Sequence, residues 1–94
     1  MKSKPTMSKN INKDIVLCET TSKAASHHTS SLLVEHSVPF TKSWKRVPFF
    51  KRKTYNGAST VCVISINKNQ YSNARRALDN LEDRDYNRLI LNVI

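Results

Sequence analysis

The sequence predicts a small α+β domain that follows a flexible, basic N-terminal arm. Residues 59–67 are rich in β-branched side chains and have the length of a strand. Residues 70–82 repeat apolar side chains at intervals of three and four positions, which is the pattern of a helix with one buried face. The 94 residues suffice for one domain but not for two, and with only 38% apolar residues the core is expected to be small.

Residues 1–39 are expected to form the flexible, polar and basic arm. They are rich in Ser, Thr, Lys and Asn, and such a segment buries too little apolar surface to offset the entropy that ordering costs. Short apolar islands interrupt it at residues 15–18 and within 30–38. The first could form a brief strand, and the second a short helix that Ser31 caps and Pro39 ends.

Residues 40–94 are expected to form the folded α+β domain. Pro48 lacks a backbone donor and restricts the residue before it, so a continuous helix through residues 42–55 is not expected. The dipeptide Asn56-Gly57 is the strongest turn signal in the sequence. It predicts a hairpin that joins residues 51–55 to the strand that follows.

The predicted strand and the predicted helix each have assignable faces. Alternation along the strand places Cys62, Ile64 and Ile66 on one face and Val61, Val63 and Ser65 on the other. Both faces are largely apolar, as in a strand that is covered on both sides. The buried face of the helix is expected to consist of Tyr71, Ala74, Leu78 and Leu81.

Residues 86–94 fit two interpretations. Alternation would put Leu89, Leu91 and Val93 on one face of a strand, which completes a strand-helix-strand core with parallel strands and a crossover helix. A helical period would make the segment a second helix and the core strand-helix-helix. We favour the strand, because a cluster of branched apolar side chains at a terminus suits a sheet.

In the strand-helix-helix version, residues 60–94 resemble the ribbon-helix-helix family of DNA-binding proteins in length and order. In that family, strands from two subunits pair and enter the major groove. The resemblance implies a homodimer that binds duplex DNA. The outward strand face would here carry Val61, Val63 and Ser65, which are poor readers of base edges, and no glycine separates the helices.

The segment KSWKRVPFFKRKTY, residues 42–55, combines six basic and four aromatic residues and contains no acid. Most of the net charge of +9 lies in the N-terminal part of the sequence, which includes this segment. Residues 1–56 carry eleven cations and three acids, whereas residues 57–94 carry five cations and four acids. This distribution favours a polyanionic partner: nucleic acid first and an anionic membrane surface second.

We predict that residues 42–55 bind RNA or single-stranded nucleic acid, in preference to duplex DNA and with little sequence specificity. Cations would displace phosphate counterions, and rings would stack on unpaired bases. The predicted binding residues are Lys42, Trp44, Lys45, Arg46, Phe49, Phe50, Lys51, Arg52, Lys53 and Tyr55. In the competing interpretation, the rings only cover the core while the lysines stay in solvent.

A second class of function is a protein-interaction module. The apolar islands would dock on a partner protein, and the positive charge would only steer the encounter. A compact, basic chain with one glycine would suit an accessory protein of a virus or a mobile element. Self-association into a homodimer is compatible with either class.

The sequence contains no catalytic constellation, so an enzyme is not expected. A chain with one glycine cannot build a glycine-rich phosphate loop. Cys18 and Cys62 match no metal-binding spacing, and His27, His28 and His36 fit no standard site. We therefore expect neither a metal nor a cofactor.

The sequence also predicts an intracellular protein, cytoplasmic or nuclear. No run of residues is long and apolar enough to span a membrane. The basic N-terminus is not followed by the apolar segment of a secretory signal.

Overall fold

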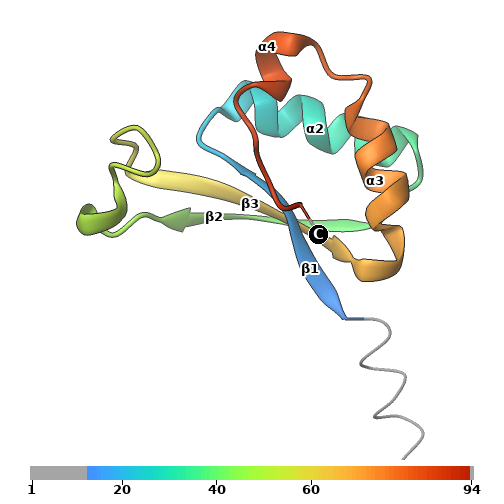
Figure 1. The fold of residues 1–94 in the computed structure, drawn as a ribbon, viewed down its shortest axis with the longest axis horizontal. Coiled ribbons are helices and arrows are strands. Elements are labelled where there is room, and N and C mark those ends of the chain that lie inside the picture. Colours follow the sequence, from blue (N-terminus) through green and yellow to red (C-terminus); the bar gives the residue numbers. More distant parts are fainter. Residues whose placement is uncertain (1–12, 94) are drawn as a thin grey trace, which may run out of the picture.

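The computed structural model describes residues 13–93, which form a four-stranded antiparallel sheet with helices packed on one face (Figure 1). The elements are β1 (Asp14–Thr20), α2 (Lys23–Glu35), β2 (Phe40–Arg46), η1 (Phe49–Lys51), β3 (Thr60–Asn67), η2 (Lys68–Gln70), α3 (Tyr71–Leu78), α4 (Asp83–Tyr86) and β4 (Ile90–Leu91). The short elements η1 and η2 are single turns of 3-10 helix. The predicted α+β class is confirmed.

The strands lie in the order β2-β3-β1-β4, and every neighbouring pair is antiparallel. Strands β1 and β2, which α2 connects, are therefore parallel to each other with β3 between them. Strands β3 and β4, which α3 and α4 connect, are parallel with β1 between them. This is the split β-α-β arrangement, repeated once. The predicted strand-helix-strand core is present, with β1 inserted into it.

Residues 14–35, which the sequence analysis assigned to the flexible arm, instead form β1 and α2. Strand β1 is central, paired with β3 on one edge and with β4 on the other. Pairing on both edges satisfies the backbone groups of the apolar island at residues 15–18, which could not fold alone. The rest of the predicted arm, residues 1–12, lies outside the described residues.

Helix α2 buries a stripe of mostly small and polar side chains. The buried residues are Ala25, Ser26, Thr29 and Leu33. Because only two of these are apolar, the stripe escapes a search for hydrophobic periodicity. The helix begins after Ser22, whose side chain accepts a hydrogen bond from the Ala25 N–H at 3.1 Å, whereas Ser31 lies inside it.

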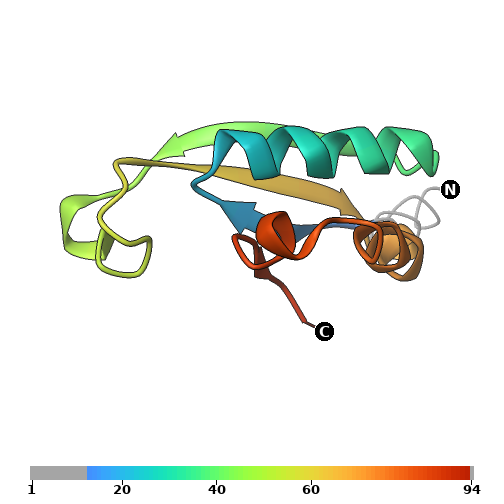
Figure 2. The same ribbon diagram turned by 90° about the horizontal axis from the view of Figure 1, so that it is seen from above.

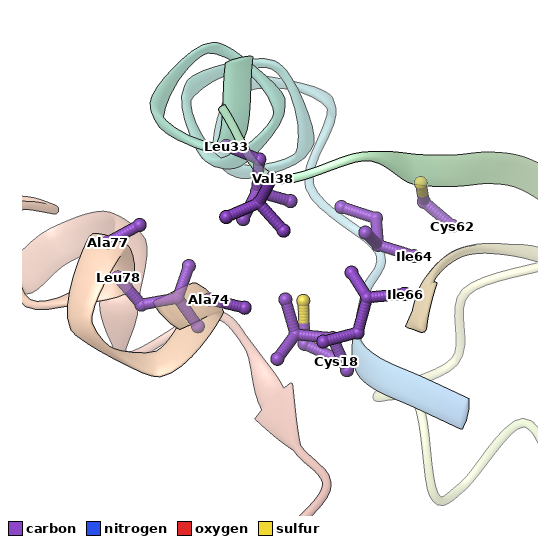
Figure 3. Packing of buried hydrophobic residues seen from close by; sticks show 10 residues of the cluster. Cys18, Leu33, Val38, Cys62, Ile64, Ile66, Ala74, Ala77 and Leu78 are labelled. Atoms are coloured by element: carbon purple, nitrogen blue, oxygen red, sulfur yellow. The ribbon is translucent and has the colours of Figure 1, made fainter. Parts of the chain in front are cut away.

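The main core lies between the helices and one face of the sheet. Cys62, Ile64 and Ile66 of β3 point into it, as the predicted alternation requires. Figure 3 shows Ala74 and Leu78 of α3 and Leu33 of α2 converging on Ile64 and Ile66. Tyr71 packs against the same cluster, so Tyr71, Ala74 and Leu78 of the buried helix face were predicted correctly. The helix ends at Leu78 and not at residue 82, and Leu81 reaches the cluster from the turn that follows.

A second, smaller cluster lies on the opposite face of the sheet. Val61 and Val63 of β3 are buried there with Val47, and Tyr55 packs against them. The connection between β2 and β3 thus folds back over the sheet. Strand β3 is covered on both sides, which explains why both of its faces are apolar.

The predicted hairpin forms with different bounds. The strand that precedes the turn is β2, residues 40–46, and not residues 51–55. Asn56 and Gly57 have φ values of 57° and 82° and form the tight turn inside the long connection at residues 47–59. These positive φ values explain why Asn and Gly occupy the two positions.

The C-terminal segment contains a short helix followed by a short strand, so the favoured strand forms but is only two residues long. Helix α4 occupies residues 83–86, and β4 pairs with β1 through only Leu91 opposite Cys18 and Ile90 opposite Glu19. Side chains fasten the segment further: the Tyr71 hydroxyl donates to the Asn92 carbonyl at 2.7 Å, and the Asn92 amide donates to the Val16 carbonyl at 2.7 Å.

Both cysteines are buried free thiols in the core. Burial raises the pKa of Cys18 to about 12, and the neighbouring Cys62 and Glu19 add to the effect. Cys62 Sγ lies 3.3 Å from Ser26 Oγ. Both buried thiols therefore behave as small apolar groups.

Replacing Ile64 by Ala should lower the free energy of unfolding by about 2–5 kcal/mol, because it leaves a cavity at a fully buried position. Val34→Ala is the matched control: Val34 is 67% exposed, and its truncation should change stability by less than about 0.5 kcal/mol. Urea unfolding followed by circular dichroism measures both. Equal losses in the two variants would contradict the assigned core.

Candidate nucleic-acid interface

Nine of the ten predicted binding residues lie on one protruding part of the molecule, formed by β2 and residues 47–53. Together with the rest of the connection to β3, residues 40–59 are called the basic hairpin below. Figures 1 and 2 show that its outer end projects beyond the helices. Within this part of the fold, all six predicted cations and the three rings Trp44, Phe49 and Phe50 are exposed.

Alternation along β2 divides its side chains between the two faces of the sheet. Lys42 and Trp44 lie opposite Ile64 and Cys62, so they project on the helix side. Arg46 follows on that side, where Trp44 is 41% exposed. Lys45 lies opposite Val61 and projects on the other side. An indole thus stands between two cations on one face, with neighbours about 6–7 Å apart along the strand.

The outer edge of β2 has no neighbouring strand among the described residues. The Val47 N–H donates to the Ser59 carbonyl at 2.8 Å. Because bonded and non-bonded positions alternate along an antiparallel pair, the odd-numbered residues of β2 bond to β3 and the even-numbered residues do not. The backbone groups of Lys42, Trp44 and Arg46 therefore point away from β3. The outer edge of β2 therefore presents backbone N–H groups beside the exposed side chains of Lys42 and Arg46.

The connection between β2 and β3 is a series of tight turns. The N–H of Lys51 donates to the Pro48 carbonyl at 2.9 Å, and the N–H of Gly57 donates to the Arg52 carbonyl at 2.6 Å. Phe49 and Phe50 are 80% and 71% exposed, with ring centroids 6.2 Å apart in an edge-to-face contact. Two phenyl rings are thus held in solvent next to the cations at 51–53.

Tyr55 is separated from the other predicted rings. Its hydroxyl donates to Glu19 Oε1 at 3.0 Å, and its ring packs against the Val47–Val61–Val63 cluster. This hydrogen bond, more than burial, raises the pKa of Tyr55 above its usual value of 10.0. Sequence reasoning grouped Tyr55 with the other rings, whereas its contacts tie the connection to β1.

Positive charge in this region is uncompensated. No acid occurs between Glu35 and Asp79 in the sequence. Among residues 13–93 the ion pairs are His28–Asp85 and Arg84–Glu82, so none of the six cations of the basic hairpin is paired. Unpaired cations on one protruding element are suited to a polyanion.

His27 and His28 lie in α2, and His36 caps the C-terminus of that helix. His28 of α2 places Nδ1 2.6 Å from Oδ2 of Asp85, a buried carboxylate of α4 that sequence reasoning did not single out. The partners are 57 positions apart, so no local pattern could reveal the pair. Within residues 13–93 no three His, Cys, Asp or Glu side chains are arranged to hold a metal ion.

No family model, curated protein or solved structure matches this chain. In the described part of the chain, none of the helices has the length and apolar character that crossing a membrane requires.

Tyr55→Phe should leave the fold intact but loosen the connection between β2 and β3, because it removes the hydroxyl that donates to Glu19. Amide hydrogen exchange of residues 51–58 is expected to accelerate about three- to tenfold at neutral pH. Phe49→Leu, in the same connection but at a side chain that makes no hydrogen bond, is the control.

The pH dependence of this bond has a definite sign. Because the folded-state pKa of Tyr55 is raised above 10.0, the contribution of the bond is complete below pH 10.0 and is lost as pH rises through the raised value. Identical exchange in wild type and Tyr55→Phe would show that the Val47–Val61–Val63 cluster alone anchors the connection.

Proposed function

We propose that this protein is a non-enzymatic nucleic-acid-binding protein that takes up RNA or single-stranded nucleic acid through the basic hairpin, with little sequence specificity. One observation carries the proposal: six unpaired cations and three exposed rings occupy a single protruding element. An intracellular location, cytoplasmic or nuclear, accompanies this function.

The cations supply most of the binding free energy in this proposal. Each phosphate that a Lys or Arg neutralises releases condensed counterions, which makes affinity strongly dependent on salt. The backbone N–H groups along the free edge of β2 are additional phosphate donors. None of these contacts distinguishes one base from another, so sequence specificity is low.

Stacking accounts for the preference for unpaired bases. A four-stranded sheet can stack bases on aromatic side chains of its open face, but here the face away from the helices carries Val16, Val61 and Val63, and the latter two are buried under the connection between β2 and β3. The rings available for stacking are Trp44 on β2 and the Phe49–Phe50 pair. Stacking on such rings contributes about 1–3 kcal/mol per base and requires bases that are not paired in a duplex.

A protein partner is the second candidate, and the free edge of β2 favours it. An extended, acidic segment could pair with the outward backbone groups of Lys42, Trp44 and Arg46. A ribbon-helix-helix dimer is not supported, because both edges of β3 pair within the chain and no edge is left for a second subunit.

The test is a titration of single-stranded RNA and duplex DNA at several salt concentrations, followed by the fluorescence of Trp44, the one tryptophan in the chain. If all six cations contact phosphates, log K should fall against log salt with a slope of about −4 on single strands or −5 on duplex. Stacking on Trp44 should quench its fluorescence with RNA more than with duplex.

Paired variants assign the site. Lys42→Gln/Arg46→Gln should flatten the single-strand slope by about 1.4, since two phosphate contacts are lost. Lys68→Gln/Arg76→Gln changes the net charge equally outside the basic hairpin and should leave the slope nearly unchanged. Absence of RNA binding at low salt, or equal effects of the two double variants, would refute the proposed site and turn attention to a protein or membrane partner.

A further inference from the structure

A cavity of about 560 Å³ separates the basic hairpin from the C-terminal segment. Its lining comes from residues 54–56, from the β1–α2 connection at residues 21–22 and from residues 87–90. Figures 1 and 2 show these three segments converging at the same end of the sheet. The volume falls within the range of about 300–1,000 Å³ that is usual for small-molecule sites.

The walls of this cavity are fixed by contacts already formed. Tyr55 is held by Glu19 and by the valine cluster on the sheet. On the opposite wall, the Thr20 hydroxyl donates to the carbonyl of Arg88 at 2.9 Å. Asn56 is held in its positive-φ turn. These contacts fix the backbone of the cavity walls, whereas the exposed side chains of Asn56, Asn87 and Arg88 can reorient toward a ligand.

Exposed polar side chains at the cavity have no partner within the described part of the protein. Over residues 13–93, neither the guanidinium of Arg88 nor the side-chain amides of Asn56 and Asn87 make a hydrogen bond or ion pair within the protein. The lining contains one cation and no acid, together with hydroxyls of Thr21 and Thr54. This chemistry fits a ligand that has an anionic group and both donors and acceptors.

We propose that the cavity binds one nucleotide. The Tyr55 ring would lie against the base, the amides of Asn56 and Asn87 would each offer a donor and an acceptor to its polar edge, and Arg88 would pair with the phosphate. Leu89 and Ile90 supply apolar surface for the sugar and the base. Sequence reasoning placed Tyr55 at a stacking surface along the basic hairpin, whereas this cavity gives it a separate role.

The nucleotide can come from either of two sources. It is a free mononucleotide, or it is one unit of a strand bound along the basic hairpin, whose cations at 51–53 precede Tyr55 closely in sequence. The inference rests on the cavity and goes beyond the proposed function, so each can fail without the other.

The test is nuclear magnetic resonance titration of the ¹⁵N-labelled full chain with AMP, UMP, adenosine and a single-stranded oligouridylate. Either mononucleotide should shift the amides of residues 54–56 and 87–90 saturably. The nucleoside should bind roughly tenfold more weakly than AMP, because it lacks the phosphate that pairs with Arg88. If only the oligouridylate shifts these amides, the nucleotide comes from a strand.

Arg88→Gln should reduce AMP affinity to that of adenosine and leave adenosine binding unchanged. Arg84→Gln, four positions away on α4 and outside this cavity, is the matched control and should change neither. Asn87→Ala should weaken nucleotide and nucleoside alike.

Three outcomes would overturn the inference. One is the absence of saturable shifts at residues 54–56 and 87–90 with any probe. Another is equal binding of AMP and adenosine to the wild type, and the last is unchanged AMP binding in Arg88→Gln. Shifts from the oligouridylate confined to residues 42–53 would leave the proposed function intact and refute only the nucleotide cavity.

Discussion

The rest of the structure depends on the pairing of β3 with strands on both of its edges. This pairing places Ile64 and Ile66 under the helices and Val61 and Val63 under the returning connection. It also extends β2 outward as an edge strand whose backbone faces solvent. One apolar strand therefore organises the core, the anchored connection and the exposed basic surface, and loss of its ladder would remove all three together.

The sequence predicts those elements whose pattern is local and strong. The branched residues of β3 and the apolar spacing of α3 each carry their own signal. Strand β1 was predicted only as an alternative to the flexible arm, because its short apolar island is stable only between β3 and β4. The N-terminal part of α2, before residue 31, was missed because Ser26 and Thr29 occupy half of the buried stripe of the helix. In both cases tertiary contacts, and not propensity, decide the structure.

The candidate interface was predictable in composition but not in geometry. Its cations and rings are neighbours in sequence, so grouping them requires no knowledge of the fold. The division of Lys42 and Arg46 from Lys45 depends on the placement of β2, which the turn signal misassigned. Tyr55 is held apart from the other rings by its hydrogen bond to Glu19, which lies 36 positions earlier in the sequence. The cavity likewise requires residues 87–90, which are distant from Tyr55 in the sequence. No local pattern carries such distant contacts.

The exposed edge of β2 has a consequence for self-association. A flat, unpaired edge invites a second copy to add its own strand, and positive side chains along the edge oppose such pairing. Lys42, Lys45 and Arg46 would bring like charges together if two copies of β2 aligned. If a polyanion binds as proposed, it would neutralise these same side chains and so remove the protection. Several chains bound side by side on one long polyanion would then present unprotected β2 edges to one another. Pairing between these edges would join their sheets into larger assemblies.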